Sequence, residues 1–251
     1  MSMKTIREKL KWLMTHDNNS LKTICADKLR VRTYIKEKLK LKDYQLFVPI
    51  LGIYNKAEDI DFSKLPNKFV LKCNHGSGFN VVCEDKNKLD KKKAMTLLNT
   101  WMKRDYSRVH GEMHYSGIEH KIFCEQYLEK NSFNDYKFWC FDGDPKFFTV
   151  NGDVSVKNYP ITFYGLDGKL LKYSRKDHPS SKKQMEFNKA MLSKMIAYAE
   201  ILSKDFKHAR IDFIVTKDRF YFGEITFISN CGNIDFEDPK DDIEVGNFLK
   251  I

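Results

Sequence analysis

The spacing of apolar residues predicts a helical segment at the start of the chain. In residues 3–45 apolar positions recur every three or four residues, which indicates one helix near the N-terminus and a second over about 26–40. The residues expected to face inward are Ile6, Leu10, Leu13 and Met14 in the first helix and Leu29, Tyr34, Ile35 and Leu39 in the second. The apolar run within 42–52 predicts a short extended stretch that ends at Pro49.

The pattern then changes to short apolar runs separated by polar turns, which is typical of strands. The expected order is a strand at 69–72, a glycine-containing loop at 74–80, a strand at 81–84, a helix at 90–104 and a strand at 121–124. Residues 136–173 predict an antiparallel meander with turns at Asp142-Gly143 and Asp167-Gly168. A long helix over 182–205 precedes a hairpin over 209–226, with its polar turn around Lys217 and Asp218.

Strands grouped before and after helices favour an α+β fold with two lobes over a doubly wound parallel sheet. We place the boundaries at 1–63 for a helical N-terminal region, 64–125 for a small lobe and 126–251 for a large lobe. A chain of 251 residues, 42% of them hydrophobic, can bury a core in each lobe.

The six cysteines are dispersed and form no C-x-x-C pair. This usage favours reduced thiols, most of them acting as small buried apolar groups, and a cytosolic protein. No apolar run has the length of a membrane span, and the charged N-terminus lacks the apolar region of a signal peptide. The sequence therefore predicts a soluble cytoplasmic protein.

The net charge of +10 points to an anionic partner. No nucleic-acid-binding motif is evident, so we expect no nucleic acid partner. Phosphorylated or acidic small substrates explain the sign of the charge equally well.

Three charged residues of the C-terminal hairpin form the first candidate site. Asp212 and Glu224 fall on its two strands, with Arg210 two residues before Asp212. Neighbouring strands of a hairpin bring such positions side by side, and two carboxylates on rigid strands suit Mg²⁺, which usually arrives with nucleotide phosphates. An ordinary hairpin with exposed charges is the alternative.

Two further segments are candidates for binding a nucleotide. Lys72 ends a strand and precedes a loop whose Gly76 and Gly78 allow the backbone N–H groups to approach an anion closely. The strand from Lys121 runs on to Leu128, and its edge could offer backbone groups to a purine. A simple two-glycine hairpin and a simple strand end are the alternatives.

Taken in order, these segments resemble the ATP-grasp superfamily. A-D-K-L-R at 26–30 looks like the helix start that precedes the small lobe of D-alanine–D-alanine ligases, and E-Q-Y-L at 125–128 looks like the hinge between lobes. R-x-D at 210–212 and E-x-T at 224–226 are similar to the pair that holds metal and phosphate. A narrower resemblance is to the TupA-like branch, which is linked to teichuronopeptide biosynthesis. The matching segments are F-V-L-K-C-N-H-G-S-G at 69–78, D-Y-K-F-W-C-F-D-G at 135–143 and F-G-E-I-T-F at 222–227.

The resemblance implies a two-lobed ATP-grasp fold, with the nucleotide in a cleft between two antiparallel-sheet subdomains, and a role for each matched residue. The residues implied to bind ATP are Lys28 and Lys72 at the phosphates, His75, Gly76, Ser77 and Gly78 in the covering loop, Glu125, Tyr127 and Leu128 around the adenine, Asp135 at the ribose, and Lys137 at phosphate or an acidic substrate. The residues implied to hold Mg²⁺ are Asp212, Glu224 and Thr226, with Thr226 in the place where asparagine is usual. Arg210 and Lys72 are the implied catalytic residues.

The resemblance also implies the reaction. ATP would phosphorylate a carboxylate to an acyl phosphate, and an amine would attack it to give an amide, ADP and phosphate. Family context points to cell-surface polysaccharide (capsule, O-antigen or teichuronopeptide), with small or glycan-linked carboxylate and amine substrates. Such work would take place in the cytoplasm or at the inner face of its membrane.

Two other function classes stay open. The same ATP site could serve a phosphotransferase with a sugar hydroxyl as acceptor. A sugar transferase or carbohydrate-binding protein that does not use ATP is the second, and Asp142-Gly-Asp144 is the nearest fit to a D-x-D motif, although it looks like a turn.

Two weaker features have alternatives of their own. His110, His114 and His120 could hold a metal, but glycines nearby disfavour a helix and contact with a substrate is the more plausible role. The N-terminal apolar stripe could lie on an anionic membrane surface, although packing against the protein body is the favoured interpretation.

Overall fold

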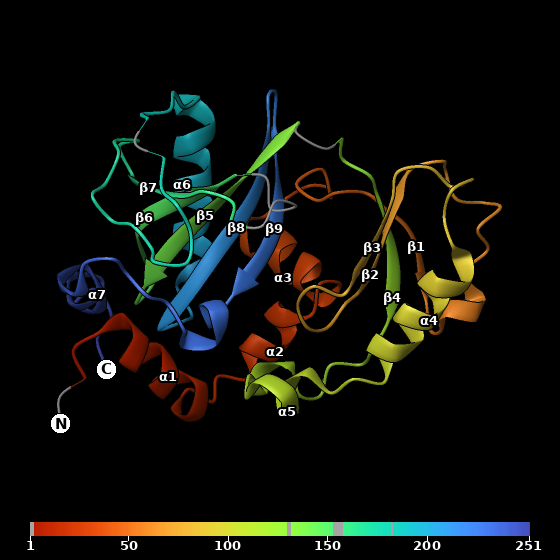
Figure 1. Ribbon diagram of the computed structural model, residues 1–251, viewed down its shortest axis with the longest axis horizontal. Helices are drawn as coiled ribbons and strands as arrows, with labels where there is room; N and C mark the ends of the chain where they lie inside the picture. The colour runs from red at the N-terminus through yellow and green to blue at the C-terminus, as the bar shows by residue number, and fades with distance from the viewer. Residues whose placement is uncertain (1–2, 130–131, 153–157, 182) are drawn as a thin grey trace.

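The computed structural model describes residues 3–129, 132–152, 158–181 and 183–251, which fold into two lobes (Figure 1). Within these residues the strands form a four-stranded antiparallel sheet in the order β1-β4-β2-β3 and a five-stranded antiparallel sheet in the order β7-β6-β5-β8-β9. Each sheet has its own core of buried side chains. The predicted α+β fold with two antiparallel lobes is confirmed.

The small lobe is built from residues 50–126. Its strands are β1 (Ile50–Tyr54), β2 (Phe69–Cys73), β3 (Asn80–Cys83) and β4 (Ile122–Gln126), and its helical segments are η1 (Ala57–Asp59), α4 (Lys91–Met102), α5 (Tyr106–His110) and η2 (Met113–Tyr115). The predicted strands and helix between 69 and 124 are confirmed to within one or two residues. The predicted extended stretch over 42–52 is wrong, because Pro49 does not end a strand. Its carbonyl accepts a bond from the amide of Gln126 at 3.0 Å, and β1 begins at the next residue.

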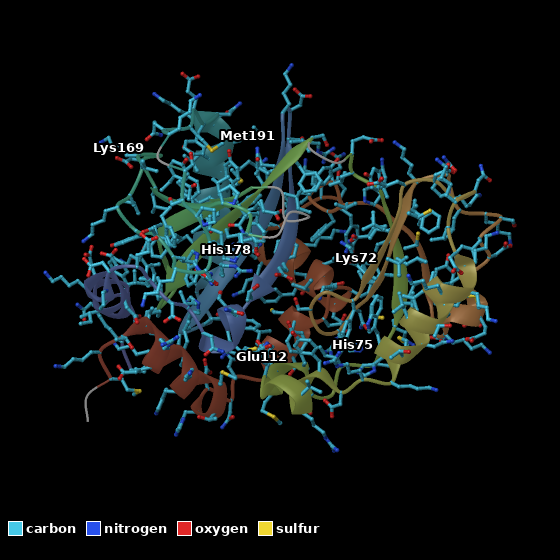
Figure 2. All side chains as sticks on the ribbon, in the orientation of Figure 1. Lys72, His75, Glu112, Lys169, His178 and Met191 are labelled. Carbon is cyan, nitrogen blue, oxygen red and sulfur yellow. The ribbon has the colours of Figure 1, made fainter. Side chains whose placement is uncertain are left out.

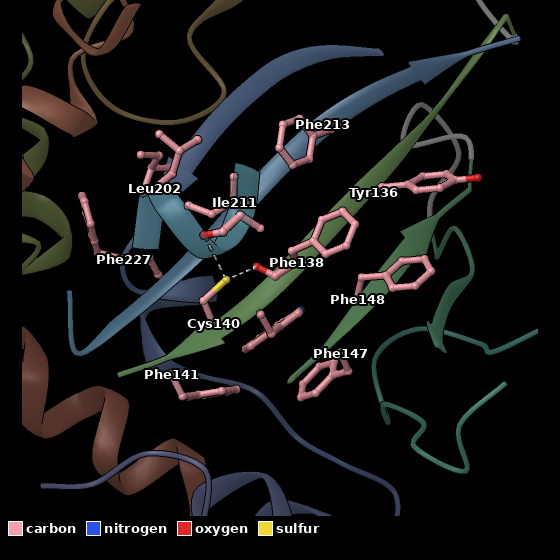
Figure 3. Packing of buried hydrophobic residues seen from close by; sticks show 14 of the residues in the cluster. Tyr136, Phe138, Cys140, Phe141, Phe147, Phe148, Leu202, Ile211, Phe213 and Phe227 are labelled. Atoms are coloured by element: carbon pink, nitrogen blue, oxygen red, sulfur yellow. Dashed lines mark hydrogen bonds between the residues drawn. The ribbon is translucent and has the colours of Figure 1, made fainter. Parts of the chain in front are cut away.

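The large sheet shows why alternation in the sequence places charges on one face. Its strands are β5 (Phe133–Phe141), β6 (Asp144–Asn151), β7 (Ile161–Gly165), β8 (His208–Thr216) and β9 (Phe220–Thr226). Successive strand residues point to opposite faces. In β5, Tyr136, Phe138 and Cys140 are buried in the core, where the thiol of Cys140 lies 3.9 Å from the carbonyl of Ala199 in α6 (Lys189–Ser203) (Figure 3). Asp135, Lys137 and Trp139 therefore lie on the other face of the sheet.

Helix α6 is shorter than the predicted 182–205. It begins at Lys189 because the side chain of Asn188 accepts a bond from the amide of Met191 at 3.1 Å and caps the first turn. Residue 182, the predicted start, lies outside the described residues. The predicted turn at Asp142-Gly143 is confirmed, and both residues have positive φ, as a tight turn between two strands requires.

A β-bulge at Gly223 brings the two hairpin carboxylates to one face. Phe213 pairs with Phe222, but Asp212 pairs with Glu224, so β9 contains one extra residue. Without the bulge Glu224 would share a face with the core residue Ile211. Gly223 fits because the chains approach closely here: a Cβ would lie 3.0 Å from the carbonyl oxygen of Asp212.

The N-terminal helices pack against the large lobe. They are α1 (Ile6–His16), α2 (Leu21–Ala26) and α3 (Arg30–Lys38), and near the C-terminus η3 (Ser229–Gly232) and α7 (Pro239–Gly246) join them. The predicted helix over 26–40 is interrupted at Asp27, whose Oδ1 accepts bonds from the amides of Leu29 and Arg30 at 2.9 and 3.3 Å. Leu29 is only partly buried, and Val31 lies in the core with Ile35.

The apolar stripe of α1 belongs to the large-lobe core. Ile6 and Leu10 are fully buried there, and Leu13 is 2% exposed. The packing interpretation of this stripe is confirmed, and the stripe is not available to a membrane surface. Among the described residues, no helix combines the length and apolar character that crossing a bilayer requires.

Candidate active site

Two adjoining cavities, which share three wall residues, lie at and beside the space between the lobes. The inter-lobe cavity, of about 310 Å³, is bordered by β2, β4 and the loop at 74–80 on one side and by β5, β8 and β9 on the other. The sheet-face cavity, of about 510 Å³, lies over the polar face of the large sheet. Ser77, Lys137 and Glu224 line both. Figure 2 shows Lys72 on the small-lobe side and His178 over the large sheet.

A cluster of three charged residues lies on the large sheet. Asp212 accepts two bonds from Arg210, at 2.7 Å to each oxygen, and a third from Lys137 Nζ at 2.7 Å. Strand register places Lys137 directly opposite Asp212, and Arg210 is two residues away on the same face. Burial and the nearby Arg210 would lower the pKa of Lys137, but the carboxylates of Asp212, Asp135 and Glu224 together outweigh them and hold the pKa above its ordinary value.

Glu224 extends from this cluster into both cavities. It accepts bonds from Thr226 Oγ1 at 3.1 Å and from Arg210 Nη2 at 3.4 Å, and its side chain is 38% exposed. Burial would raise the pKa of Glu224, but Lys28, Lys137 and Arg210 together lower it to about 2. Glu224 is therefore ionised at neutral pH.

The chemistry of these groups fits a magnesium ion. Mg²⁺ in nucleotide sites takes one or two carboxylates and completes its shell with water and phosphate oxygens. Asp212 and Glu224, paired across neighbouring strands, would supply the two carboxylates. Among the described residues no group of three or more His, Cys, Asp or Glu side chains could hold a metal, so the remaining ligands would come from water or a substrate. The Thr226 hydroxyl is engaged by Glu224 and Arg210.

The small lobe carries a second charged cluster. Glu125 accepts a bond from Lys72 Nζ at 2.5 Å and another from Arg32, whose Nη1 also donates to the carbonyl of Val48 at 2.9 Å. Glu125 is 6% exposed, and strand β4 holds it in the wall of the inter-lobe cavity. Arg32 was not predicted from the sequence, where it precedes Glu125 by 93 positions.

Lys28 is bonded to the loop at 74–80. Its Nζ donates to the carbonyl oxygen of Gly76 at 2.5 Å, and its amide donates to the carbonyl of Asn74 at 3.0 Å. Gly76 has a φ of 71°, and a Cβ there would lie 2.6 Å from the ring of Tyr106. Gly78 also has positive φ but has open space around it. These bonds to Lys28 hold the loop where the two cavities adjoin, and Ser77 lines both cavities.

His75 and the 125–128 segment differ from the expected arrangement. The structure does not bring His75 to either cavity: its ring stacks on His120 at 3.5 Å and its Nε2 lies 3.0 Å from the carbonyl of Trp101. Burial lowers the pKa of His75 to about 4. Neither Tyr127 nor Leu128 is in the cavity wall, and the Tyr127 hydroxyl donates to Glu84 at 3.2 Å. Backbone contacts of this segment with a purine stay a prediction.

Several apolar and polar wall residues were not identified from sequence. The apolar residues of the inter-lobe cavity are Phe47, Val48, Phe79, Phe123, Ile214 and Phe222. The sheet-face cavity adds polar residues and aromatic rings, among them Trp139, Thr149, Asn151, Tyr159, Arg175 and His178. Alternation along β6 could have marked Thr149 and Asn151 as sharing a face with Lys137. Asp135 lines the inter-lobe cavity as expected, and burial raises its pKa despite the opposing effect of Lys137.

The weaker candidates separate in the structure. His120 pairs with His75, whereas His114 packs against Phe227 with its pKa lowered to about 3 by burial. The side chain of His110 lies outside the described residues. Asp142 pairs with Lys207 in the turn between β5 and β6, away from the residues that line either cavity.

The fold is that of an ATP-grasp protein. The chain belongs to the TupA-like ATP-grasp family, whose sequence profile matches residues 8–250. The L-amino acid ligase from Bacillus licheniformis has a TM-score of 0.52 and 16% identity, over 83% of this chain and 44% of that protein. The D-alanine–D-alanine ligase from Bacillus anthracis has a TM-score of 0.48 and 17% identity, over 82% of this chain and 57% of that protein.

These solved structures are longer than this chain, which spans 44% and 57% of their lengths. At such low identity the likeness concerns the fold alone. Comparison with curated protein sequences gives no match.

Proposed function

We propose that this protein is an ATP-dependent, ADP-forming ligase that joins a carboxylate to an amine. ATP occupies the inter-lobe cavity and the other substrates occupy the sheet-face cavity. The observation that carries the proposal is the junction of the two cavities. Ser77, Lys137 and Glu224 line both, so a phosphoryl group bound there could pass from one to the other.

The inter-lobe cavity has the groups that a nucleotide needs. Lys28 and Lys72 bind the phosphates, exchanging their present partners, the Gly76 carbonyl and Glu125, for phosphate oxygens. The apolar rings and branched side chains of the same cavity cover the adenine, and Asp135 binds the ribose. Asp212 and Glu224 would hold Mg²⁺, which would neutralise charge on the phosphates.

Arg210 and Lys137 act on the other side of the junction. Both line the sheet-face cavity, and Asp212 fixes their positions before a substrate arrives. Donors fixed in advance stabilise charge that develops in the transition state, here on the transferring phosphoryl group and on the carbonyl oxygen that the amine attacks. The Gly76–Gly78 loop excludes water, which would otherwise hydrolyse the acyl phosphate.

The sheet-face cavity supports a sugar-linked substrate. Amide and hydroxyl groups of Thr149, Asn151 and Tyr159 lie beside aromatic faces, and this mixture suits a ligand with many hydroxyls. We therefore place the reaction in cell-surface polysaccharide synthesis, with a uronic acid or an amino acid as the source of the carboxylate.

Product analysis tests the proposal. Purified protein is incubated with ATP, Mg²⁺ and pairs drawn from uronic acids, amino acids and simple amines, and ADP and free phosphate are measured. A ligase releases one free phosphate for each ADP and each amide formed. ADP with phosphate retained on a sugar would instead indicate a phosphotransferase, and no nucleotide turnover would contradict both.

Two lysine variants, one in the cavity wall and one outside it, test where the reaction takes place. Lys137→Met should lower turnover by about 10²-fold or more, because it removes a fixed cation at the junction. Lys169→Ala is the control, since Lys169 is 83% exposed and lies outside both cavities (Figure 2). Equal activity of the two variants would contradict the assigned site.

A further inference from the structure

Glu112 is a buried acidic residue in the wall of the sheet-face cavity. It follows α5, whose C-cap Gly111 has a left-handed φ of 71°, and its side chain is 7% exposed. Figure 2 shows it below and between the two lobes. It borders the cavity that also contains Arg210 and Glu224. The nucleotide binding and metal binding proposed above do not involve Glu112.

The neighbours of Glu112 leave its charge uncompensated. The thiol of Cys231 donates to Oε2 at 3.9 Å, and Nε2 of His114 lies 3.7 Å from Oε1. Burial lowers the pKa of His114 to about 3, so this imidazole is neutral at physiological pH. In the part of the chain that the structure describes, no lysine or arginine forms an ion pair with Glu112.

This setting contrasts with that of Glu125 and Asp212, each of which binds one arginine and one lysine. Burial, and secondarily the charge of Glu224, raises the pKa of Glu112 to about 7. The titratable or charged groups that face Glu112 are Tyr106, His114, Tyr115, Glu224 and Cys231, with Arg210 across the same cavity. A buried carboxylate that lacks a cation and faces a substrate cavity can take its cation from the substrate.

We propose that Glu112 binds the ammonium group of the acceptor substrate and removes a proton from it as the nitrogen attacks the acyl phosphate. This inference rests on the proposed ligase function and adds the residue that acts on the amine. An ammonium ion supplies the missing positive charge, and it has no lone pair for attack until a proton leaves. A general base works best when its affinity for a proton matches the operating pH.

Protons and electron pairs balance in this step. One ammonium proton passes to a carboxylate oxygen of Glu112, and the freed lone pair forms the bond from nitrogen to the acyl carbon. The bond from that carbon to the phosphate oxygen then breaks, and inorganic phosphate leaves with the electron pair and the second nitrogen proton. Glu112 returns its proton to solvent before the next turnover.

A comparison of two nucleophiles tests the role of Glu112. Hydroxylamine traps an acyl phosphate as a hydroxamate, and as a weakly basic amine it attacks without a protein base. Wild type, Glu112→Gln and the control Glu119→Gln are assayed with ATP, Mg²⁺ and D-glucuronate, D-galacturonate or L-glutamate as carboxylates. The nucleophile is hydroxylamine, glycine, L-alanine or L-lysine. Glu119 lies in the same segment, and its side chain is 79% exposed.

The expected result is selective. Glu112→Gln should keep the hydroxamate rate within about twofold and lose amide formation by about 10²- to 10⁴-fold, the range for a general base. Glu119→Gln should keep both. Equal loss of both reactions in Glu112→Gln, or loss of neither, would overturn the inference and leave the ligase standing. A wild type that forms no hydroxamate with any carboxylate would remove the ligase function itself.

The pH profile of the wild type gives a second readout that does not depend on folding of the variant. Amide formation should rise about tenfold per pH unit up to about pH 7 and then level off, because Glu112 is then ionised while the amine remains an ammonium ion. A rate that continues to rise with the unprotonated fraction of the amine, well above pH 7, would contradict a protein base.

Discussion

Each lobe contributes one buried carboxylate held by an arginine and a lysine, but the two clusters are built differently. Asp212, Arg210 and Lys137 all stand on neighbouring strands of one sheet. Glu125 and Lys72 stand on the small sheet, whereas Arg32 comes from α3, whose buried face lies in the large-lobe core. The first cluster is fixed within a lobe and the second joins the two lobes.

The difference separates a rigid part of the site from one that can adjust. Strand register sets the positions of Arg210, Asp212 and Lys137 on the large sheet. Their geometry therefore stays the same when the lobes move relative to each other. The bond from Arg32 to Glu125 depends on how the lobes meet, and phosphate binding by Lys72, as proposed, would release Glu125. We infer that the large sheet positions the chemistry and that the small-lobe cluster responds to the nucleotide.

Removal of each arginine tests this comparison with the largest expected effect. Arg210→Met should lower the free energy of unfolding by about 3–5 kcal/mol, because Asp212 stays buried with one cation instead of two. Arg210 also bonds to Ser229 and Thr226, whereas Arg32 makes one further bond, to a carbonyl. Arg32→Met should therefore cost roughly half as much. Urea denaturation measures both, and equal losses would argue against the distinction.

Glu112 extends the comparison, because among the described residues no lysine or arginine forms an ion pair with this carboxylate in the wall of the sheet-face cavity. The pKa of Glu112 in the folded protein, about 7, lies above the ordinary value of 4.5. The contribution of Glu112 to the free energy of unfolding is therefore fully present below pH 4.5 and is lost as the pH rises through 7. Glu112→Gln should thus stabilise the protein by roughly 3 kcal/mol at pH 8 and have little effect near pH 4.5.

Glu224 should show the opposite dependence. Its pKa is lowered to about 2, so its contribution is present above pH 4.5 and is lost as the pH falls toward 2. Glu224→Gln should be destabilised at pH 7, and its difference from wild type should shrink in acid. Unfolding curves over this pH range measure both variants. If the change in unfolding free energy varied with pH in the same way for Glu112→Gln and Glu224→Gln, the neighbouring cations would not be the cause of the difference between the two carboxylates.

The covering loop offers the smallest test. Gly78→Ala should cost about 1–2 kcal/mol, the price of a left-handed φ with a side chain. Gly76→Ala should cost about 1–3 kcal/mol more, because the new Cβ also meets the ring of Tyr106 at 2.6 Å. Thermal unfolding midpoints compare the two. A larger loss for Gly78→Ala would contradict the packing around the loop.

The sequence predicted the parts of the site that lie close together in the chain. One hairpin contains Arg210, Asp212 and Glu224, so their spacing in the sequence was enough to predict that they lie together. Lys72 likewise stands just before the glycine-containing loop at 74–80. Spacing could not show the bulge at Gly223, which decides the face on which Glu224 lies. The signal for a bulge was present, since an isolated glycine stands inside a strand pattern.

Long-range partners were out of reach for the same reason. Arg32 meets Glu125 only because α3 packs between the lobes, and no local pattern encodes that contact. His75 was misplaced by proximity: it lies in the loop motif, but its ring packs against His120 and the end of α4. In the sequence, the segment around Glu112 was a candidate because of His110 and His114. In the structure, Glu112, which lies between them in the chain, borders the sheet-face cavity.

We propose that the inter-lobe cavity binds ATP together with Mg²⁺. The most direct measurement is the thermal unfolding midpoint with a non-hydrolysable ATP analogue, with and without Mg²⁺, for wild type, Lys72→Ala, Glu224→Gln and the control Lys169→Ala. A ligand that binds the folded state raises this midpoint. We expect a Mg²⁺-dependent rise in wild type and Lys169→Ala that is lost in Lys72→Ala and Glu224→Gln. No rise in folded wild type at millimolar nucleotide would contradict ATP binding in this cavity.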